Sequence, residues 1–596
     1  DNLNIPIAIE RSRSGNGAHA WLFFEEAISA SSARKLGNAL LTKAMSVRHE
    51  IQFSSYDRMF PNQDFMPKGG FGNLIALPLQ GGARKNGNSE FVDENFQSYH
   101  DQWAYLGSIR KMNQAKIDQL LSELCIGNGL GELANTKDNE EIKPWESKKI
   151  EPLNTKDFPD ILTIVEANRL YIPKEEISHK ALNRIKRLSA FQNPQFYKTQ
   201  KMRMSTYGIP RIIHSLSETE EYIGIPRGCR SSLIDLLDGS NAKYVFDDKR
   251  NKGRQVNVCF KGALREEQDL AANTLLQYEN GILSVPTAFG KTVIGASLIA
   301  SRKCNTLILV HLQTLCDQWK KSLEQFLEIN ESLPEPEKKR GRKKVRSIIG
   351  QIGSGKDTSS NIIDIALVQS LVHENEVNDI VKKYGMVIVD ECHHASSLNY
   401  ERVLSETNAL YVYGLTATPK RQDGQHPVTF MQCGSIRYSV SAKEQAIKRS
   451  FEHYVIHCFT GFKKPLPQKK SDWHITKIYA DLSEDEIRNQ QIATDVKEAV
   501  IDGRTPIILT QRKEHVMQLA AIIRNLTDVH VITLVGTDST KVKNKMTESL
   551  AAISQDEKLI IIATGKYIGE GFNYPRLDTL FLASPIAWKG TLAQYA

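Results

Sequence analysis

Short apolar segments alternate with amphipathic segments over the second half of the chain. The strand-like segments are nearly continuous runs of Val, Ile and Leu, whereas the segments between them repeat their apolar positions with helical spacing. Such an alternation is typical of a parallel sheet covered on both faces. The pattern predicts strands at 282–285, 306–311, 362–368, 386–389 and 411–415, and helices at 292–301 and 315–326.

A second unit of the same kind lies nearer the C-terminal end. Its predicted strands are 506–509, 529–534, 559–563 and 579–583. We therefore expect an α/β fold with two parallel-sheet lobes in tandem, at 262–445 and 446–596.

The first part of the chain has a less regular pattern. Apolar runs at 20–24 and 74–79 lie among Gly-rich turns, and 104–125 has the pattern of a helix. Residues 134–160 are polar and have the composition of a linker, and a helical run at 231–237 lies in a smaller mixed unit. The expected divisions are a partial α+β domain at 1–130, a linker with a helical segment at 131–205, and a small accessory domain at 206–261.

The composition is that of a folded protein. Hydrophobic residues make up 40% and charged residues 24% of the 596 residues, a length that corresponds to about four domains. No apolar run approaches the roughly 18 residues of a membrane span, and no signal peptide is visible, so we expect no membrane partner. The eight cysteines include no Cys-x-x-Cys pair, which argues against a zinc ribbon or a disulfide framework and favours a cytoplasmic location. The net charge of +8 permits a polyanionic partner.

A glycine-containing loop at 286–292 joins the first predicted strand to its helix. Backbone N–H groups in such a loop cradle phosphates together with the helix N-terminus. Lys291 is expected to reach the β- and γ-phosphates of ATP, and the Thr292 hydroxyl to bind Mg²⁺. The expected backbone contacts are at Thr287, Ala288 and Gly290.

A second segment, 350–356, also fits the pattern G-x-x-x-x-G-K. It is followed by Asp357, where the phosphate loop requires a hydroxyl, and a carboxylate would repel phosphate. Because the residues that follow are polar and do not have the pattern of a helix, we reject this segment as the nucleotide site.

Two neighbouring acids follow the predicted strand at 386–389. Asp390 at the carboxyl end of a strand, in the same sheet as the phosphate loop, is well placed for the Mg²⁺ shell. Glu391 beside it is expected to polarise the attacking water. Lys291, Asp390 and Glu391 are thus the predicted catalytic residues.

Together these features resemble superfamily 2 DExH helicases and translocases, in the form seen in XPB-type and phage UvsW-type motors. The resemblance covers residues 262–596, and it implies that both lobes are RecA-like. The segments that carry it are 264–268 (Q motif), 310–319 (motif Ia), 369–371 (motif Ic), 390–393 (motif II), 416–424 (motif III), 510–512 (motif IV) and 563–573 (motif V).

The resemblance implies roles for these residues. Arg265 and Gln268 would read the adenine, and Gly569 and Glu570 would make further nucleotide contacts. His393, Thr416, Thr418 and Gln594 would couple closure of the lobes around ATP to the nucleic-acid groove. Nucleic acid would be contacted by His311, Gln369, Ser370, Thr510, Arg512 and Thr564. The arginines of motif VI would follow Gln594, and the chain stops at Ala596, so this chain is expected to bind ATP better than it hydrolyses it.

A strongly basic segment interrupts the first lobe. Residues 338–346 hold seven basic side chains, namely Lys338, Lys339, Arg340, Arg342, Lys343, Lys344 and Arg346. Such a segment is either a solvated loop or an insertion that contacts the phosphates of DNA, and the sequence leaves both open.

The N-terminal region carries a further Gly-rich segment. Ser14, Gly15 and Gly17 precede His19 and the apolar run at 20–24, and taken alone this is an ordinary hairpin turn. With Asp57, Asp64 and Lys68 further along, it resembles the archaeo-eukaryotic primase–polymerase domains that are fused to helicases in TOTE conflict systems.

This second resemblance implies that His19 and the Gly-rich turn contact a nucleotide. Lys68 would touch its phosphates, and Asp64, or less favourably Asp57, would be a metal ligand. The family's paired hhhDxD acids are not found upstream, where Asp1 stands alone, so this chain is not expected to polymerise by itself.

Three functions are compatible with the sequence. The first is an ATP-dependent DNA helicase or translocase, acting on single-stranded or duplex DNA and coupled to a primase–polymerase-like module in defence or mobile-element DNA metabolism. The second is a restriction-type motor whose N-terminal part only recognises DNA. The third is a non-catalytic clamp switched by nucleotide. RNA stays open as an alternative to DNA, and the sequence does not identify a protein partner.

Overall fold

The computed structural model divides the chain into two compact units, Asp1–Lys249 and Arg250–Ala596. Within these units the structure describes residues 3–47, 59–61, 75–124, 152–202, 204, 209–333, 338–339, 342–343, 347–419, 421, 423–448, 454–463, 475–536, 542, 546, 548–550, 552–554, 556–568 and 574–586. No helix among these residues has the length and hydropathy of a membrane span. The seven cysteines that fall within them are free thiols.

The N-terminal domain is built on a small antiparallel sheet in the order β2-β1-β3. Leu36, Met112, Ile117 and Leu120 form its buried core. Its strands are β1 (Ala8–Arg11), β2 (Ala18–Trp21) and β3 (Phe91–Val92), and its helices are α1 (Ala30–Val47), α2 (Gly81–Arg84), α3 (Gln102–Ser108) and α4 (Gln114–Leu124).

The single helix predicted at 104–125 is wrong, because it is two helices with a break between them. Met112 lies in the break, where its backbone accepts a hydrogen bond from the N–H of Glu25 and donates one to the carbonyl of Phe23. The apolar run at 20–24 is only partly a strand, because β2 ends at Trp21 and Phe24 forms only an isolated bridge to Met112. Pairing with a distant segment therefore outweighs the helical pattern here.

A five-stranded sheet in the order β10-β4-β5-β9-β8 follows in the same unit. Its strands are β4 (Leu162–Glu166), β5 (Leu170–Pro173), β8 (Ser217–Glu218), β9 (Tyr222–Ile225) and β10 (Tyr244–Asp248). The other elements are α5 (His179–Arg187), α6 (Pro194–Lys201), α7 (Arg230–Asp238), the hairpin-like pair β6 (Ala190–Gln192) and β7 (Ile212–His214), and the 3₁₀ turns η3 (Thr155–Asp157) and η4 (Arg227–Cys229).

This sheet corrects the boundary expected between 205 and 206. β10 pairs in parallel with β4, and β9 pairs with β5, so the expected division would cut the sheet in two. The helical run predicted at 231–237 is confirmed as α7.

The first lobe contains a mostly parallel sheet of eight strands, in the order β18-β17-β19-β13-β22-β23-β12-β24. These strands are β12 (Asn280–Ser284), β13 (Thr306–Val310), β17 (Ile349–Gly353), β18 (Lys356–Asp357), β19 (Ile363–Leu367), β22 (Met386–Asp390), β23 (Tyr411–Thr416) and β24 (Ile436–Ser439). The short strands are β11 (Val258–Phe260), β14 (Leu327–Ile329), β15 (Lys338–Lys339), β16 (Arg342–Lys343), β20 (Val372–His373) and β21 (Glu376–Val377).

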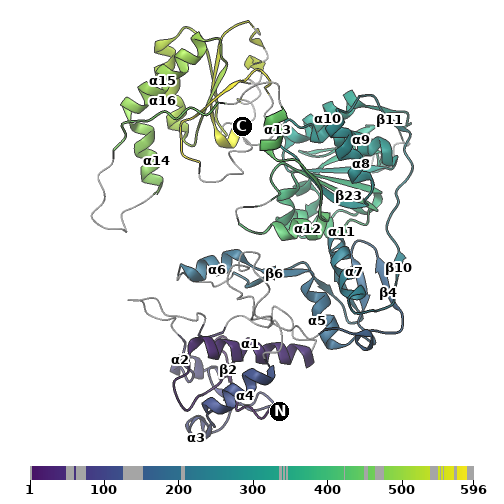
Figure 1. Ribbon diagram of the computed structural model, residues 1–596, viewed down its shortest axis with the longest axis vertical. Helices are drawn as coiled ribbons and strands as arrows, with labels where there is room; N and C mark the ends of the chain where they lie inside the picture. Colours follow the sequence, from purple (N-terminus) through teal and green to yellow (C-terminus); the bar gives the residue numbers. More distant parts are fainter. Residues whose placement is uncertain are drawn as a thin grey trace. The chain divides into compact units, whose positions relative to one another are not determined.

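Helices cover both faces of this sheet, as Figure 1 shows for α8, α9 and α10 on one face and α11 and α12 on the other. Along β13, Ile308 and Val310 point into the first layer and Leu307 and Leu309 into the second. The helices are α8 (Glu266–Leu276), α9 (Lys291–Arg302), α10 (Gln313–Phe326), α11 (Leu398–Glu406), α12 (His426–Cys433) and α13 (Ala442–Lys448), with 3₁₀ turns η5 (Val368–Ser370), η6 (Asp379–Lys383) and η7 (Cys392–Ser396).

The first lobe begins earlier than expected. Val256 and Val258 are buried in its core, and β11 pairs with β14, so the boundary expected at 261 and 262 lies inside the lobe. Residues 350–356 form the hairpin of β17 and β18, which agrees with their rejection as a phosphate loop. Gly350 has a packing role there, since a Cβ would overlap the Asp364 carboxylate.

The second lobe has a four-stranded parallel sheet in the order β26-β27-β25-β28. Ile508, Ile560 and Ile562 pack against α15 and α16 on one face, while Leu559 and Ile561 lie in a separate core on the other. Its elements are β25 (Pro506–Thr510), β26 (His530–Leu534), β27 (Leu559–Thr564), β28 (Thr579–Leu582), α14 (Ile475–Glu484), α15 (Glu486–Ile501), α16 (Lys513–Leu526) and α18 (Gly565–Ile568). The predicted parallel sheets of both lobes are thus confirmed.

Candidate functional site

The loop predicted to hold phosphate lies at the carboxyl end of β12 and leads into α9. Ala288 and Gly290 have left-handed backbones, with φ of 62° and 99°, and the buried ring of Phe289 anchors the loop between them. A Cβ on Gly290 would overlap Nε2 of Gln268, so the loop accepts only glycine at this position. The first N–H groups of α9, at Lys291 and Thr292, follow at once, and helix N-termini of this kind favour anions.

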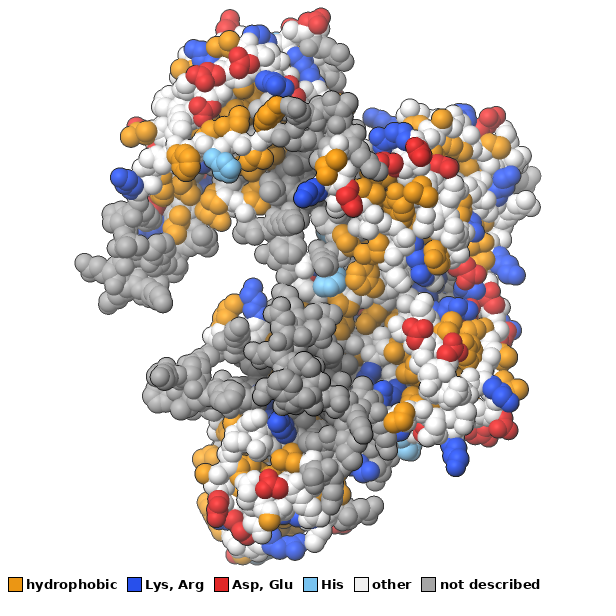
Figure 2. All heavy atoms as spheres, viewed as in Figure 1, with side chains coloured by type: hydrophobic (Ala, Val, Ile, Leu, Met, Phe, Trp, Pro, Cys, Tyr) orange, Lys and Arg blue, Asp and Glu red, His pale blue; other side chains and the backbone are white. Residues whose placement is uncertain are grey.

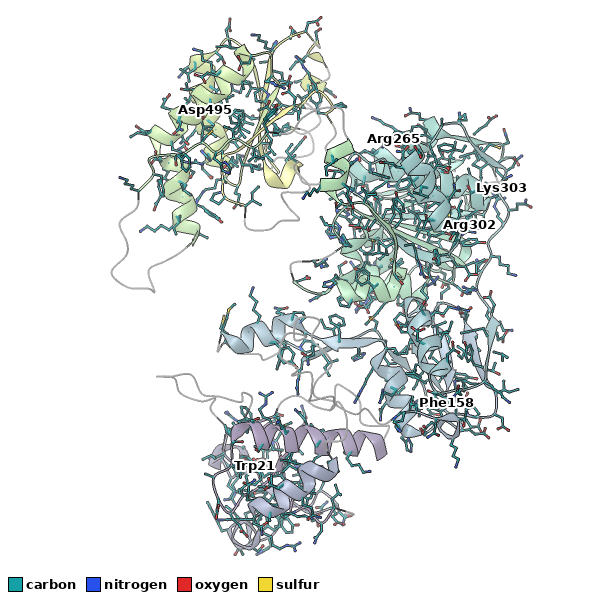
Figure 3. All side chains as sticks on the ribbon, viewed as in Figure 1. Trp21, Phe158, Arg265, Arg302, Lys303 and Asp495 are labelled. Atoms are coloured by element: carbon teal, nitrogen blue, oxygen red, sulfur yellow. The ribbon has the colours of Figure 1, made fainter. Side chains whose placement is uncertain are left out.

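Arg265 and Gln268, predicted to contact the adenine, hold this loop in the structure (Figure 3 labels Arg265). Nη2 of Arg265 and Nε2 of Gln268 both donate to the Phe289 carbonyl, at 2.6 and 2.7 Å. Oε1 of Gln268 also accepts a hydrogen bond from the Arg265 backbone N–H at 3.0 Å. The two side chains therefore shape the phosphate loop, and their contact with a base stays a prediction.

Lys291 and Glu391 form a nearly buried ion pair. Nζ of Lys291 lies 2.5 Å from Oε1 of Glu391, and each side chain is 13% exposed. Burial opposes the charge of Lys291, but Glu391 and Asp390 together raise the pKa of its ammonium above the ordinary value. Burial likewise opposes the charge of Glu391, but Lys291 and His393 lower the pKa of its carboxyl well below the usual range. Glu391 is thus held as an anion.

Asp390 ends the buried strand β22 and is 5% exposed. Its Oδ2 accepts a hydrogen bond from the Trp319 indole at 2.7 Å, and its Oδ1 accepts one from the Glu391 N–H at 3.0 Å. Burial, reinforced by the like charge of Glu391, raises the pKa of Asp390. A cation bound beside Asp390 would offset both effects, so this carboxylate fits an Mg²⁺ ligand.

The residues predicted to couple the site to nucleic acid form a chain of hydrogen bonds. Nδ1 of His393 lies 3.3 Å from Oε2 of Glu391 and 3.1 Å from Oγ1 of Thr416. The Thr416 hydroxyl in turn accepts a hydrogen bond from the Thr418 N–H at 3.1 Å. Arg421 then binds the His393 carbonyl through Nη1 at 2.7 Å. The structure thus links motif II and motif III.

Three residues predicted to contact nucleic acid lie together at the carboxyl edge of the first-lobe sheet. Nε2 of Gln369 donates to the His311 carbonyl at 3.0 Å, and Gln369 and Ser370 are exposed. The His311 ring packs 4.3 Å from the ring of His394, which was not predicted and which follows directly on motif II.

In the second lobe, the hydroxyls of Thr510 and Thr564 form hydrogen bonds within the protein. Thr510 is 2% exposed and binds Nδ1 of His515 at 2.7 Å, while Thr564 accepts a hydrogen bond from the Gly536 N–H at 2.9 Å. The side chain of Arg512 is 39% exposed, so among these three predicted contacts it is the one that faces solvent.

Several predicted residues lie outside the described part of the chain, namely Asp57, Asp64, Lys68, Arg340, Lys344, Arg346, Gly569, Glu570 and Gln594. Of the basic segment, Lys338 and Lys339 pair with Arg342 and Lys343 as the short antiparallel ladder β15–β16. On the face drawn in Figure 2, basic and acidic side chains are interspersed over the described surface.

In the N-terminal domain, the hairpin of β1 and β2 places Glu10 opposite His19. Glu10 is 2% exposed, and its Oε2 lies 3.0 Å from Nδ1 of His19 and accepts the Trp21 indole N–H at 2.7 Å. Its other oxygen accepts the Ser89 hydroxyl at 2.8 Å. Trp21 is labelled in Figure 3. Glu10 was not predicted, although its register opposite His19 could have been inferred from a two-residue alternation across a hairpin.

The Gly-rich turn before His19 is a hairpin turn closed by hydrogen bonds. Ser12 and Gly17 close it by a backbone hydrogen bond of 2.7 Å, and the Gly17 N–H also donates to the Ser12 hydroxyl. Gly15 has a left-handed φ of 81°, and Ser14 hydrogen-bonds with Ser12. The turn leaves the His19 side chain 47% exposed.

Two family models match separate parts of the chain, the N-terminal domain and the first lobe. Residues 1–120 match the Archaeo-Eukaryotic Primase domain of TOTE conflict systems, and residues 261–421 match the res subunit of Type III restriction enzymes. The chain joins a primase-like domain to a superfamily 2 helicase domain.

Named relatives and a solved structure are similar to parts of this chain. "Putative helicase 161L" of Invertebrate iridescent virus 6 is 28% identical over 356 residues, which is 56% of this chain and 74% of the viral protein. "DNA 3'-5' translocase XPB2" of Sulfurisphaera tokodaii is 30% identical over 185 residues, which is 31% of this chain and only 37% of that protein. The crystal structure of T4 UvsW is 14% identical, with a TM-score of 0.35, and covers 73% of this chain and 87% of its own.

Proposed function

We propose that this protein is an ATP-driven DNA helicase or translocase, coupled to a primase–polymerase-like module. The observation that carries the proposal is the buried Lys291–Glu391 pair, which stands beside a phosphate loop and beside Asp390. The match of residues 1–120 to the TOTE primase domain supports the second module and a role in defence or in the metabolism of mobile DNA.

The site fits ATP and Mg²⁺. Asp390 and Thr292 would hold the metal ion, and the N–H groups at the start of α9 would hold the phosphates. When bound, Mg²⁺ neutralises charge that develops on the phosphate oxygens.

The catalytic residues of the chain must rearrange for hydrolysis. Lys291 is shared between Glu391 and the phosphates, so phosphate binding draws its ammonium away from the Oε1 of Glu391. Glu391, released and still anionic, can then orient a water and take its proton. His393 lies beside the other oxygen of Glu391 and beside Thr416, so this change reaches the motif III backbone at Thr418.

DNA, single-stranded or duplex, is the proposed substrate. Gln369 and Ser370 in the first lobe are exposed, the Arg512 side chain in the second lobe is 39% exposed, and residues 338–346 carry a dense positive charge. Contacts of this kind are made mostly to the phosphate backbone. Because RNA has the same phosphates, the test below includes RNA as well as DNA.

A restriction-type motor is the second candidate. It is favoured by the match of residues 261–421 to the res subunit of Type III restriction enzymes. In that case the N-terminal domain would recognise DNA without any polymerase activity.

The test uses the natural full-length protein rather than residues 1–596 alone. It measures ATP hydrolysis with no nucleic acid, single-stranded DNA, duplex DNA or RNA, alongside primer extension by wild type and His19→Ala. Stimulation by DNA with primer extension that requires His19 supports the first function, and stimulation without primer extension supports the second. Binding of ATP without turnover on any nucleic acid would refute both and indicate a nucleotide-switched clamp.

A further inference from the structure

The indole of Trp319 reaches the predicted metal ligand from a separate helix. Trp319 lies on α10 and is 1% exposed, and its Nε1 donates to Oδ2 of Asp390 at 2.7 Å. Asp390 is itself buried at the end of β22, 71 residues further along the chain. This hydrogen bond between the Trp319 indole and Asp390 therefore depends on the tertiary fold and is shielded from water. Leaving a buried donor or acceptor without its partner costs stability.

Packing leaves the ring little freedom. A Cβ on Gly295, in α9, would come within 2.5 Å of Cη2 of the Trp319 ring and within 3.6 Å of a Leu415 methyl group. The ring is thus wedged against the helix that begins with Lys291 and Thr292. A ring held in this way fixes the direction in which its N–H points.

The carboxylate of Asp390 is oriented by two donors, one on each oxygen. Trp319 donates to Oδ2 and the Glu391 backbone donates to Oδ1. Each carboxylate oxygen accepts about two hydrogen bonds, so one site on each oxygen stays available for a metal ion or for its water. The two donors fix the plane of the carboxylate without filling its coordination positions.

We propose that Trp319 is a positioning residue that orients Asp390 for Mg²⁺ through its indole N–H. The inference rests on the proposed ATP–Mg²⁺ site. Outer partners that orient a ligating carboxylate typically contribute about 10- to 100-fold in metal affinity. Without the N–H, Oδ2 of Asp390 is left without its buried donor, and the carboxylate is held only through Oδ1 by the Glu391 N–H.

The experiment compares Trp319→Phe with wild type and with Tyr384→Phe. The control removes a hydrogen bond of the same kind in the same lobe, because the Tyr384 hydroxyl donates to Oδ2 of the buried Asp364 at 2.6 Å. Binding of a fluorescent ADP analogue is measured in EDTA and then during a titration with Mg²⁺, and the melting temperature of each variant is recorded.

We expect Trp319→Phe to raise the half-saturating Mg²⁺ concentration about 10- to 100-fold while leaving binding in EDTA unchanged, and Tyr384→Phe to change neither. An unshifted Mg²⁺ titration, or an equal shift in Tyr384→Phe, overturns the inference. If wild type binds no nucleotide, or binds it without any response to Mg²⁺, the proposed ATP site fails and the inference with it.

A second variant guards against misfolding of Trp319→Phe. Replacing Trp319 by benzothienylalanine keeps the size and shape of the ring and puts sulfur in place of the N–H. The benzothienylalanine variant is expected to show the same rise in the half-saturating Mg²⁺ concentration. If it folds and its Mg²⁺ titration matches that of wild type, the inference is overturned.

Discussion

Replacing Glu391 with glutamine should separate nucleotide binding from turnover. In the structure, Oε1 of Glu391 accepts a hydrogen bond from Nζ of Lys291 at 2.5 Å, and both side chains are 13% exposed. With an effective dielectric constant of about 20, unit charges at this distance attract by about 7 kcal/mol before desolvation is subtracted. Because phosphate must compete with Glu391 for Lys291, the pair opposes ATP binding by some part of this energy.

The size of the effect follows from the cost of breaking such a pair. Removing one partner of a buried ion pair leaves the other charge uncompensated and costs about 3–5 kcal/mol. In Glu391→Gln this cost falls on the nucleotide-free protein, and bound phosphate relieves part of it. A relief of about 1.4–2.8 kcal/mol corresponds to ATP binding that is about 10- to 100-fold tighter. Turnover should fall about 10²- to 10⁴-fold, because a general base is lost.

The assay is equilibrium binding of a fluorescent ATP analogue, together with single-turnover hydrolysis, at one pH and one salt concentration. Glu279→Gln is the matched control, since Glu279 forms an ion pair of 2.6 Å with Arg250 in the same lobe. The reasoning is refuted if Glu391→Gln binds ATP no more tightly than wild type, or if Glu279→Gln tightens binding to the same degree.

Four further predictions concern other parts of the chain. Lys291→Ala should abolish ATP turnover, and undiminished phosphate release would disprove the site. Burial foremost, then the charge of Arg488, lowers the pKa of His515 from 6.5 to about 4, so stability present above pH 6.5 is lost as the pH falls toward 4. The loss amounts to about 3 kcal/mol, and urea unfolding of His515→Gln against wild type should show a flatter dependence on pH. Gly350→Ala should lower the free energy of unfolding by about 1–3 kcal/mol, because its Cβ would overlap the Asp364 carboxylate, and a wild-type denaturant midpoint would contradict this. Neutralising the basic residues of 338–346 should weaken DNA binding and flatten its dependence on salt concentration, whereas an unchanged slope would mark the segment as a solvated loop.

Local pattern was sufficient to predict the two lobes. Buried parallel strands are continuous apolar runs, and each lies between segments of helical spacing, so β13 and β22 were predicted to within one residue at either end. The loop proposed to hold phosphate could be located in the same way, because its residue types and its place between a strand and a helix are contiguous in the chain.

Contacts between distant segments decided the rest. The helix predicted at 104–125 breaks because Met112 pairs with the backbone of residues 23–25, and the sheet of β4 and β10 crosses the boundary expected at 205 and 206. No local pattern contains such pairings, since their partners are set by which strands meet in the folded sheet.

The candidate sites divide in the same way. The residue types proposed to bind phosphate and metal can be recognised from the sequence alone. The residues that set their charge and orientation lie far away in the sequence. Lys291 hydrogen-bonds to Glu391, 100 residues away in the sequence, and Trp319 hydrogen-bonds to Asp390, 71 residues away. Because these side chains are buried, their interactions shift pKa values and fix side-chain orientations. A charge or hydrogen-bond donor removed from water must be satisfied by the groups that the tertiary fold places beside it.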